Sequence, residues 1–296
     1  MSLGGAMYQV SIVNSFVVSG TGGNPAGVLF LPKNGMSSKK MQSIAKKMAL
    51  SETAFVSKSD DTQTYSVRFF TPTEEVPLCG HATLAVFHLL SEQRADVTCA
   101  YQDTAAGLLT IKGTRDALGL KLIMSQPSPK NRSLSLMDQK TLKKIMGIED
   151  SHPTSENLPI EIWSTGLEDI LLPVKNRDLL NSLTIDFKAL ASFSSLVNVV
   201  GVHAFAIEGT QIYARNFAPL YGIDEESATG TSNGALIAYL HHHIFPDLDC
   251  LEKQILQGEL MGNLSAITAI SERKLSSWAI WVGGYCKTIN TVLVSD

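Results

Sequence analysis

The sequence lacks the cysteine patterns that mark disulfide frameworks and structural zinc sites. Four cysteines occur in 296 residues, they are widely spaced, and no two of them form a Cys-x-x-Cys pair. Small secreted domains and zinc-binding modules both depend on closely spaced cysteines. We therefore expect a protein of a reducing compartment, the cytoplasm, with no metal ion and no disulfide framework.

Long apolar runs and an excess of positive charge are also absent. No apolar run reaches the roughly 18 residues that a membrane-spanning helix needs. The first residues contain no basic segment followed by an apolar one, as a secretory signal would. Acidic residues outnumber basic ones by 28 to 24, which does not suit binding to a phosphate backbone as the main task. We expect no membrane partner and no nucleic-acid partner.

The length and apolar content are sufficient for two domains. At roughly 150 residues per domain, the chain divides into an N-terminal half, 7–127, and a C-terminal half, 128–296. The boundary lies in QPSPKNR, residues 126–132, whose prolines and polar residues are typical of a linker. The last strand is expected to be able to pair back with the N-terminal half. Residues 1–6, MSLGGA, are interpreted as an expression leftover ahead of Met7.

Two segments, one in each half, look like copies of one device. LCGHA at 78–82 precedes an apolar run, and ATGTS at 228–232 precedes another. In each, glycine permits a tight turn from strand to helix, and the amides that follow begin a helix, where they can bind an anion. The two glycines are 150 residues apart, which suggests a duplication. Each helix is apolar on almost every face, so we expect strands to surround it.

Predicted strands outnumber predicted helices. Alternating or β-branched segments predict strands at 8–18, 65–70 and 118–124, and the C-terminus adds 279–282 and 288–294. With one apolar helix in each half, this pattern favours an α+β fold in which a barrel or roll of strands closes around a helix, twice. The alternative is a doubly wound parallel sheet, in which glycine turns also precede helices. The sequence lacks the regular alternation of strands and helices that this alternative requires.

Two residues of the N-terminal half are candidates for acid/base chemistry. Glu52 follows a predicted helix and precedes the apolar residues 54–56, and an apolar surrounding would suit its carboxyl group to moving protons. A solvated residue at the start of a strand is the alternative. His81 follows Gly80 at a helix start, where the helix dipole disfavours an imidazolium ion. A neutral, hydrogen-bonding imidazole is therefore expected, unless His81 only caps the helix.

A run of three carboxylates, residues 224–226, precedes the second turn. Glu226 can act with Glu52 as an acid and base pair, or the run can simply complement the positive end of the helix dipole. Thr231, like His81 in the first turn, is the first side chain after the glycine. Its hydroxyl can bind a substrate carboxylate or cap the helix.

Three other features are weaker signals. Asn24 in GGNP can meet a substrate, although an Asx turn is the simpler interpretation. Residues 241–243 are three histidines, but successive helical side chains point about 100° apart, so a surface patch at the helix end is a better interpretation than a metal cluster. The glycine-rich residues 20–23 lack the lysine and helix that follow in a phosphate loop. The sequence therefore indicates neither a metal nor a nucleotide cofactor.

Six motifs extend over most of the chain. They are GGNPAGV at 22–28, LSETAFV at 50–56, FTPTEEVPLCGHATLA at 70–85, STGLEDILLPV at 164–174, RNFAP at 215–219 and ESATGTSNGAL at 226–236. Together they resemble the PhzF-like proteins of phenazine biosynthesis, which are related to diaminopimelate epimerase. The resemblance implies a diaminopimelate epimerase-like fold of two pseudo-symmetric halves, each a barrel around a central helix, and a homodimer.

The resemblance also implies roles for individual residues. Glu52 corresponds to a general acid/base that moves a proton within an unsaturated amino-acid ring, and His81 lines the site. The Gly-hydroxyl pair of the second helix start binds the substrate carboxylate, which implies site roles for Gly80, His81, Gly230 and Thr231. The backbone amides of Gly80 to Ala82 and of Gly230 to Ser232 are expected, as helix starts, to hold the carboxylate and developing charge, and Asn24 is a further candidate for contact with the substrate. No cofactor is implied.

The chain departs from the family pattern in two motifs. Glu226 and Thr231 stand where the family often has the Asp and Ser of Asp-Pro-Ala-Thr-Gly-Ser, and Asn263 replaces the Arg of Met-Gly-Arg-Pro-Ser. The second carboxylate is therefore one methylene longer, and a cation is missing. We expect a pocket of different shape.

The first hypothesis for function is a cofactor-independent isomerase that moves a proton within a small carboxylate-bearing molecule, with Glu52 as base and then acid. The alternatives are an amino-acid epimerase or racemase that uses Cys79 with another base, such as Glu52, and a catalytically silent binding protein. Racemisation with two thiols is disfavoured because Thr229 stands where the related epimerases have their second cysteine. A hydroxyl of ordinary pKa cannot replace a thiolate.

Overall fold

The chain forms two compact units in a computed structural model. The structure describes residues 6–58, 63–93, 98–148, 158–274 and 277–295, so residues 1–5 of the predicted expression leftover lie outside the described residues. Unit 1 consists of residues 1–125 with 283–296, and unit 2 of residues 126–282. In the described parts of the chain, no helix is both long and apolar enough to cross a membrane.

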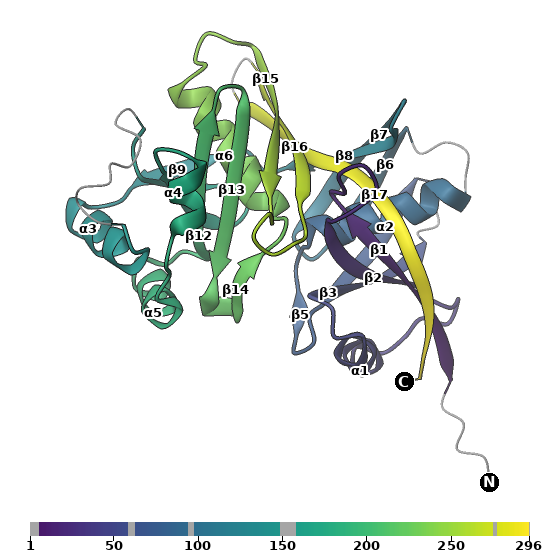
Figure 1. Cartoon of the computed structure of the whole chain (residues 1–296). Coiled ribbons are helices and arrows are strands. Elements are labelled where there is room, and N and C mark those ends of the chain that lie inside the picture. The colour runs from purple at the N-terminus through teal and green to yellow at the C-terminus, as the bar shows by residue number, and fades with distance from the viewer. Residues whose placement is uncertain (1–5, 59–62, 94–97, 149–157, 275–276, 296) are drawn as a thin grey trace. The chain divides into compact units, whose positions relative to one another are not determined.

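Unit 1 is built on a closed barrel of eight strands (Figure 1). These are β1 (Met7–Ser15), β2 (Asn24–Phe30), β3 (Glu52–Lys58), β4 (Thr64–Phe70), β6 (Cys99–Thr104), β7 (Gly107–Asp116), β8 (Gly119–Gln126) and β17 (Trp278–Ser295). Gln126 at the end of β8 and residues 278–282 at the start of β17 are counted with unit 2. Each strand pairs with the next in this order, and β17 pairs with both β8 and β1 to close the ring. The pairs β2–β3 and β4–β6 are parallel. A short strand, β5 (Glu75–Val76), pairs with β4 beside the ring.

Helix α2 (Gly80–Gln93) is surrounded by this barrel. Ten of its 14 residues are buried, and it contacts β1, β2 and β3. Its buried Thr83 hydroxyl donates to the carbonyl of Cys79 at 2.8 Å and accepts a hydrogen bond from Gln102 Nε2 at 2.9 Å. A helix that has almost no polar face is stable only where other elements cover it on all sides. The expectation that strands surround this helix is confirmed.

Helix α1 (Ser38–Met48) covers the outer face of the barrel. Its apolar residues recur at helical spacing, and they form one cluster with alternate residues of the strands below. The cluster consists of Val10, Leu29, Met41, Ile44, Ala45, Phe55 and Phe70. The strands are therefore covered by α1 on one face and by α2 on the other, and this packing fixes the place of Glu52, the first residue of β3.

Unit 2 repeats the strand order of unit 1. Its strands are β9 (Lys130–Ser133), β10 (Glu161–Ser164), β11 (Glu168–Pro173), β12 (Gly201–Glu208), β13 (Gln211–Ala218), β14 (Ile223–Glu226), β15 (Cys250–Gln257) and β16 (Ser265–Arg273). The pairs β11–β12 and β13–β15 are parallel, and β14 is a short extra partner of β13. The other pairs, β9–β10, β10–β11, β12–β13 and β15–β16, are antiparallel. Two parallel pairs among antiparallel ones in each unit are incompatible with a doubly wound parallel sheet.

Helix α6 (Gly230–His243) is the counterpart of α2. Eleven of its 14 residues are buried, and it contacts β10, β11, β15 and β16. The other face of the unit 2 strands packs on α3 (Leu136–Ile145), α4 (Arg177–Ser182) and α5 (Phe187–Val197), where Leu142, Leu180 and Leu190 are buried. The α+β prediction, with a sheet around one apolar helix in each half, is confirmed.

Two local predictions are corrected. Within the predicted linker 126–132, Gln126 ends β8 and residues 130–132 belong to β9, because this polar segment pairs with β10. The two predicted C-terminal strands are one continuous strand, β17, whose residues 286–295 pair with β1. Gly283 lies within it, and a Cβ there would collide with the carbonyl of Leu122 on β8. Glycine therefore allows the close approach that closes the barrel.

Candidate functional site

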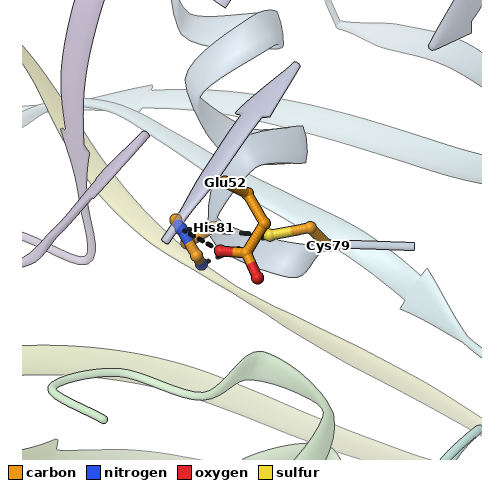
Figure 2. A group of neighbouring side chains, drawn as sticks. All are labelled: Glu52, Cys79 and His81. Carbon is orange, nitrogen blue, oxygen red and sulfur yellow. Dashed lines mark hydrogen bonds and ion pairs between the residues drawn. The ribbon is translucent and has the colours of Figure 1, made fainter. Parts of the chain in front are cut away.

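Glu52, Cys79 and His81 converge where β3 and α2 begin. Glu52 is the first residue of β3, Cys79 immediately precedes α2, and His81 is the second residue of that helix. Figure 2 shows the three side chains pointing toward one another. Glu52 Oε2 lies 3.3 Å from His81 Nε2, and Cys79 Sγ lies 3.4 Å from His81 Nδ1. A carboxylate, an imidazole and a thiol are thus within reach of one small molecule.

The surroundings of His81 favour a neutral imidazole. Burial lowers its pKa, against the opposing effect of the Glu52 carboxylate. Asn24 Nδ2 lies 3.3 Å from Nδ1, and Ser51 Oγ lies 3.2 Å from Nε2. When Asn24 donates to Nδ1, the ring proton is on Nε2, where Ser51 Oγ can accept it. Ser15 Oγ donates to the carbonyl of His81 at 2.7 Å, which anchors the first turn of α2 to β1.

Glu52 is the more accessible member of the pair. Its side chain is 13% exposed, whereas that of His81 is 3% exposed. The parallel pairing of β2 and β3 places Glu52 opposite Ala26, a small residue two positions after Asn24. The carboxylate can therefore reach a bound molecule, and its buried Oε2 has no hydrogen-bond partner among the described residues.

In unit 2, Glu226 and Thr229 are joined ahead of α6. Glu226 is the last residue of β14, and Thr229 is the residue before the helix. Thr229 Oγ1 donates to Glu226 Oε2 at 2.6 Å and makes no capping bond to the helix. The carbonyl of Thr231 accepts a hydrogen bond from Thr165 Oγ1 at 3.0 Å. The Glu226 carboxylate is thus oriented by a neighbouring hydroxyl.

A buried chain of hydrogen bonds begins at the first turn of α6. Ser232 Oγ donates to Asp169 Oδ2 at 2.6 Å and accepts from Asn216 Nδ2 at 3.1 Å. The same amide nitrogen of Asn216 lies 3.2 Å from His203 Nδ1. His203 Nε2 in turn lies 3.2 Å from Asn233 Oδ1, which returns the chain to α6. Amide donors and a single imidazole tautomer account for the direction of every bond in this chain.

Burial shifts the pKa of both titratable groups in this chain. It lowers the pKa of His203 to about 4, although the hydrogen bond with Asn233 opposes the shift. It raises the pKa of Asp169 to about 6, against hydrogen bonds from Ser232 and the Gly201 backbone. His203 is therefore neutral at neutral pH, which matches its role as donor on Nε2 and acceptor on Nδ1.

Comparison with known proteins identifies the family. A sequence model described as "Phenazine biosynthesis-like protein" matches residues 13–289. The chain belongs to this PhzF-like family. An uncharacterized isomerase of Clostridium acetobutylicum is 35% identical over 272 residues, which are 88% of each chain. The trans-2,3-dihydro-3-hydroxyanthranilate isomerase of Pseudomonas chlororaphis is 31% identical over 267 residues, 90% of this chain and 91% of that protein. On this similarity the chain is an isomerase.

A solved PhzF-family structure agrees with the fold. The PhzF-family phenazine biosynthesis protein of Bacillus anthracis superposes with a TM-score of 0.89 at 25% identity, covering 98% of this chain and all of that one. The resemblance seen in the sequence motifs is therefore confirmed at the level of family and fold.

The residues predicted from the PhzF-like motifs fall into two groups. In unit 1, Asn24 and Glu52 both lie within 3.3 Å of the His81 ring, and Gly80 and Ala82 flank His81 in the first turn of α2. The second group lies in unit 2 and consists of Glu226, Gly230, Thr231 and Ser232. Of these, the Ser232 side chain is committed to Asp169, so only its backbone amide remains suited to ligand binding.

The histidine run at the end of α6 is only in part a surface patch. His241 is fully buried, with Nδ1 2.9 Å from Ser271 Oγ and Nε2 2.7 Å from the Leu248 carbonyl. His243 instead lies 2.9 Å from Glu161. The surface interpretation is wrong for His241 because a helix enclosed by strands has no solvent face at that position.

The sequence analysis missed the polar residues that support the second turn. They are Asp169, His203, Asn216, Asn233 and Gln257, and all five are nearly fully buried. His203 is the one polar side chain in the apolar run 201–207, which is a usable signal because buried polar groups need hydrogen-bond partners. Apart from the bond from Asn233 to the Thr229 carbonyl, four residues away, their side-chain partners lie 13 to 63 residues away along the chain, so no local pattern identifies which residues meet.

Proposed function

We propose that this PhzF-like isomerase moves a proton within a small carboxylate-bearing molecule, without a cofactor, and that Glu52 is the general acid/base. The observation that carries the proposal is the 3.3 Å approach of the accessible Glu52 carboxylate to the buried His81 imidazole. The similar protein of Pseudomonas chlororaphis is named for a dihydro-hydroxyanthranilate, which supports a small ring carboxylate as the substrate class.

In this mechanism Glu52 removes a proton from a carbon next to a double bond. The electron pair of that C–H bond forms a new double bond, and the original double bond shifts its electrons to the far carbon. Protonated Glu52 then returns the proton to that carbon, so no atom is gained or lost. Glu52 Oε2 has no hydrogen-bond partner among the described residues, and the nearby Nε2–H of His81 is proposed to hold it when substrate is bound, which leaves Oε1 for the substrate. Gly80 and Ala82 in unit 1, with Asn24, are proposed as substrate-binding residues.

Residues of unit 2 complete the proposal. Gly230, Thr231 and Ser232 are proposed to bind substrate through amides at a helix start or the threonine hydroxyl, since such amides have no acceptor within the helix. Glu226, held by Thr229, is proposed as a second acid/base or orienting carboxylate. We also propose that the protein is located in the cytoplasm and forms a homodimer. Size-exclusion chromatography with light scattering tests the dimer, and a monomer would contradict it.

An epimerase that uses Cys79 is the second candidate because its thiol lies 3.4 Å from His81 Nδ1. The two are separated by incubation in D₂O with trans-2,3-dihydro-3-hydroxyanthranilate and a panel of amino and hydroxy acids, followed by proton NMR. Double-bond migration supports the isomerase proposed here, whereas exchange at one α-carbon with inversion supports the epimerase. Binding without exchange across the panel would support a silent binding protein.

Glu52→Gln tests the assignment of the base. A general base contributes about 10²–10⁴-fold, so turnover should fall by that factor while circular dichroism and the unfolding midpoint stay unchanged. Glu92→Gln, at an exposed carboxylate on the same unit, is the matched control and should retain full activity. Near-normal turnover in Glu52→Gln would exclude Glu52 as the base.

A further inference from the structure

The three side chains of Figure 2 are also a set of metal-type donors. Glu52, Cys79 and His81 each offer one ligand atom, and these atoms all lie within 4.8 Å of one another. Carboxylate oxygen, imidazole nitrogen and thiolate sulfur are the donors that Zn²⁺ prefers. The 27 residues that separate Glu52 from Cys79 explain why no spacing rule detects the set in the sequence.

Two of the three distances between the donors are close to those of a tetrahedral site. With zinc bonds of about 2.0–2.1 Å to nitrogen and oxygen and about 2.3 Å to sulfur, tetrahedral angles place N and O about 3.4 Å apart and N and S about 3.6 Å apart. His81 Nε2 lies 3.3 Å from Glu52 Oε2 and 3.9 Å from Cys79 Sγ. The third pair, the Glu52 oxygen and Cys79 Sγ, lies within 4.8 Å, against about 3.6 Å in such a site, so side-chain shifts of up to about 1 Å would bring the three atoms onto one ion.

The state of the ligands suits a metal ion that keeps one coordination position open. Burial keeps His81 neutral, as a metal ligand must be. With the metal on Nε2, the ring proton moves to Nδ1, and Asn24 can accept it through Oδ1 after its amide turns over. Three protein ligands leave a fourth position for water, which is the pattern of open zinc sites.

We propose that Glu52, Cys79 and His81 bind Zn²⁺, with the Cys79 thiol proton released to solvent. Zn²⁺ would occupy the carboxylate that the proposed mechanism needs as a base. Zinc should therefore inhibit the isomerase, a consequence that rests on the proposed function, whereas binding itself does not.

The binding test uses Co²⁺ as a coloured substitute for Zn²⁺. Metal-free protein titrated with CoCl₂ should develop the near-ultraviolet absorption of a thiolate–cobalt bond, and ZnCl₂ should abolish it. Cys79→Ser should lose this band, and Glu52→Gln should weaken binding at least tenfold. The matched control Cys99→Ser, at an exposed cysteine outside the cluster, should keep it. Absence of the band in the unmodified protein, or its loss in Cys99→Ser but not in Cys79→Ser, would overturn the proposal.

Activity measurements separate this proposal from the proposed function. Zinc that binds at the cluster without inhibiting turnover would overturn the role of Glu52 as base and leave the metal site intact. Conversely, if Glu52→Gln is inactive but the unmodified protein shows no cobalt band, the role of Glu52 as base stands and the metal site is overturned.

A second, independent observation concerns Gln257, at the end of β15. The side chain is 1% exposed and uses both of its polar atoms on the segment before α6. Nε2 donates to the Glu226 carbonyl at 2.8 Å and to Thr229 Oγ1 at 3.1 Å. Oε1 accepts from the Thr229 amide at 3.3 Å and from Asn233 Nδ2 at 2.8 Å. One amide thus holds both ends of the turn.

Gly258, the next residue, makes this approach possible. Its φ is +80°, and a Cβ there would lie 2.6 Å from the carbonyl oxygens of both Ser227 and Asn263. Such contacts are too short for any side chain, so glycine is required where β15 meets the turn.

We infer that Gln257 is a positioning residue, which fixes Thr229 and, through its hydroxyl, the Glu226 carboxylate. This inference rests on the role proposed for Glu226. Gln257→Glu keeps the shape of the side chain, removes the two donated bonds and adds a negative charge near Glu226. We expect kcat to fall at least tenfold with less effect on KM, and the acidic limb of the pH profile to move upward, because a like charge raises a carboxyl pKa.

Matched variants distinguish positioning from a structural effect. Gln254→Ala, on the same strand but exposed, should leave kcat and the pH profile unchanged. If Gln257 acts through Thr229, the effects of Gln257→Glu and Thr229→Val on kcat should not add. Additive effects, or an unchanged pH profile, would overturn the inference, and an unfolding midpoint near that of the unmodified protein shows that Gln257→Glu folds. If Glu226→Gln is fully active, the proposed role of Glu226 fails, whatever Gln257 does.

Discussion

Two carboxylates of this chain differ in how their charge is accommodated. Glu52 retains contact with solvent and faces a neutral imidazole, whereas Asp169 is buried and accepts from Ser232. A group that must release and regain a proton needs access to its substrate, while a buried group is held in one state by its surroundings. Exposure thus distinguishes the catalytic candidate from the structural carboxylate more clearly than the motifs do.

The neutral state of His81 leads to a prediction at the residue scale. His81→Asn removes the Nε2 donor proposed to hold Glu52 Oε2 during turnover and should lower kcat by about 10–100-fold, the range expected when one hydrogen bond of about 1.5–3 kcal/mol to a charged group is lost. The measurement is the rate of double-bond migration at saturating substrate. His88→Asn, on the same helix beside the exposed Glu92, is the control and should keep its activity.

An unchanged kcat in His81→Asn would contradict this prediction. A second expectation follows from the same burial: because the pKa of His81 is lowered, its ionisation should produce no transition in kcat/KM near pH 6.5. A transition there that disappears in His81→Asn would show that the imidazole is charged during turnover.

At the scale of elements, the join between β15 and α6 depends on backbone geometry. Gly258 and Gly209 both have positive φ, but a Cβ would meet the backbone only at Gly258 and open space at Gly209. Gly209→Ala should lower the free energy of unfolding by about 1 kcal/mol, the cost of left-handed backbone. Gly258→Ala should lower it by about 3 kcal/mol, since overpacking adds to the same strain. Urea unfolding with an unchanged m-value measures both, and equal costs would contradict the prediction.

The elements differ in how far the sequence predicts them. Both central helices are predictable because a helix that is apolar on every face has only one stable environment, inside a sheet. Strand β9 is not, because its four residues are polar and exposed and become a strand only by pairing with β10. In the candidate site, Glu52 and His81 follow from their motifs and from the residues around them. Gln257 does not, because its partners lie 24 to 31 residues away and its strand pattern marks it only as buried.

At the scale of the whole molecule, the two units share a strand order but have diverged in chemistry. Glu52 pairs with Ala26 at the start of the first parallel strand pair of unit 1, and at the same register position of unit 2 Gly201 pairs with Asp169. A Cβ at Gly201 would collide with the carbonyl of Phe217. In unit 2 no side chain can therefore stand at Gly201, the position that corresponds to Glu52 of unit 1. Only one of the two repeats can therefore supply a carboxylate there.

Asp169 and His203, the two buried titratable residues of the hydrogen-bond chain in unit 2, make the free energy of unfolding depend on pH. The folded pKa of Asp169 is raised to about 6, above its unfolded value of about 3.9, so near pH 5 the folded chain holds a proton that the unfolded chain releases. The folded pKa of His203 is lowered to about 4, below about 6.5, so the unfolded chain binds a proton that the folded chain does not. Between pH 4 and 6 these contributions have opposite signs and nearly cancel.

Removing one member of the pair should expose the contribution of the other. In Asp169→Asn, where an amide oxygen can still accept from Ser232, the free energy of unfolding should rise with pH by about 1.4 kcal/mol per unit relative to the unmodified protein between pH 4 and 6. In His203→Gln it should fall with pH by a similar amount relative to that protein. Urea midpoints at pH 4.5, 5.0 and 5.5 measure both slopes. Parallel curves for all three proteins would mean that neither group changes its proton affinity on folding, and burial would not be the factor that keeps His203 neutral.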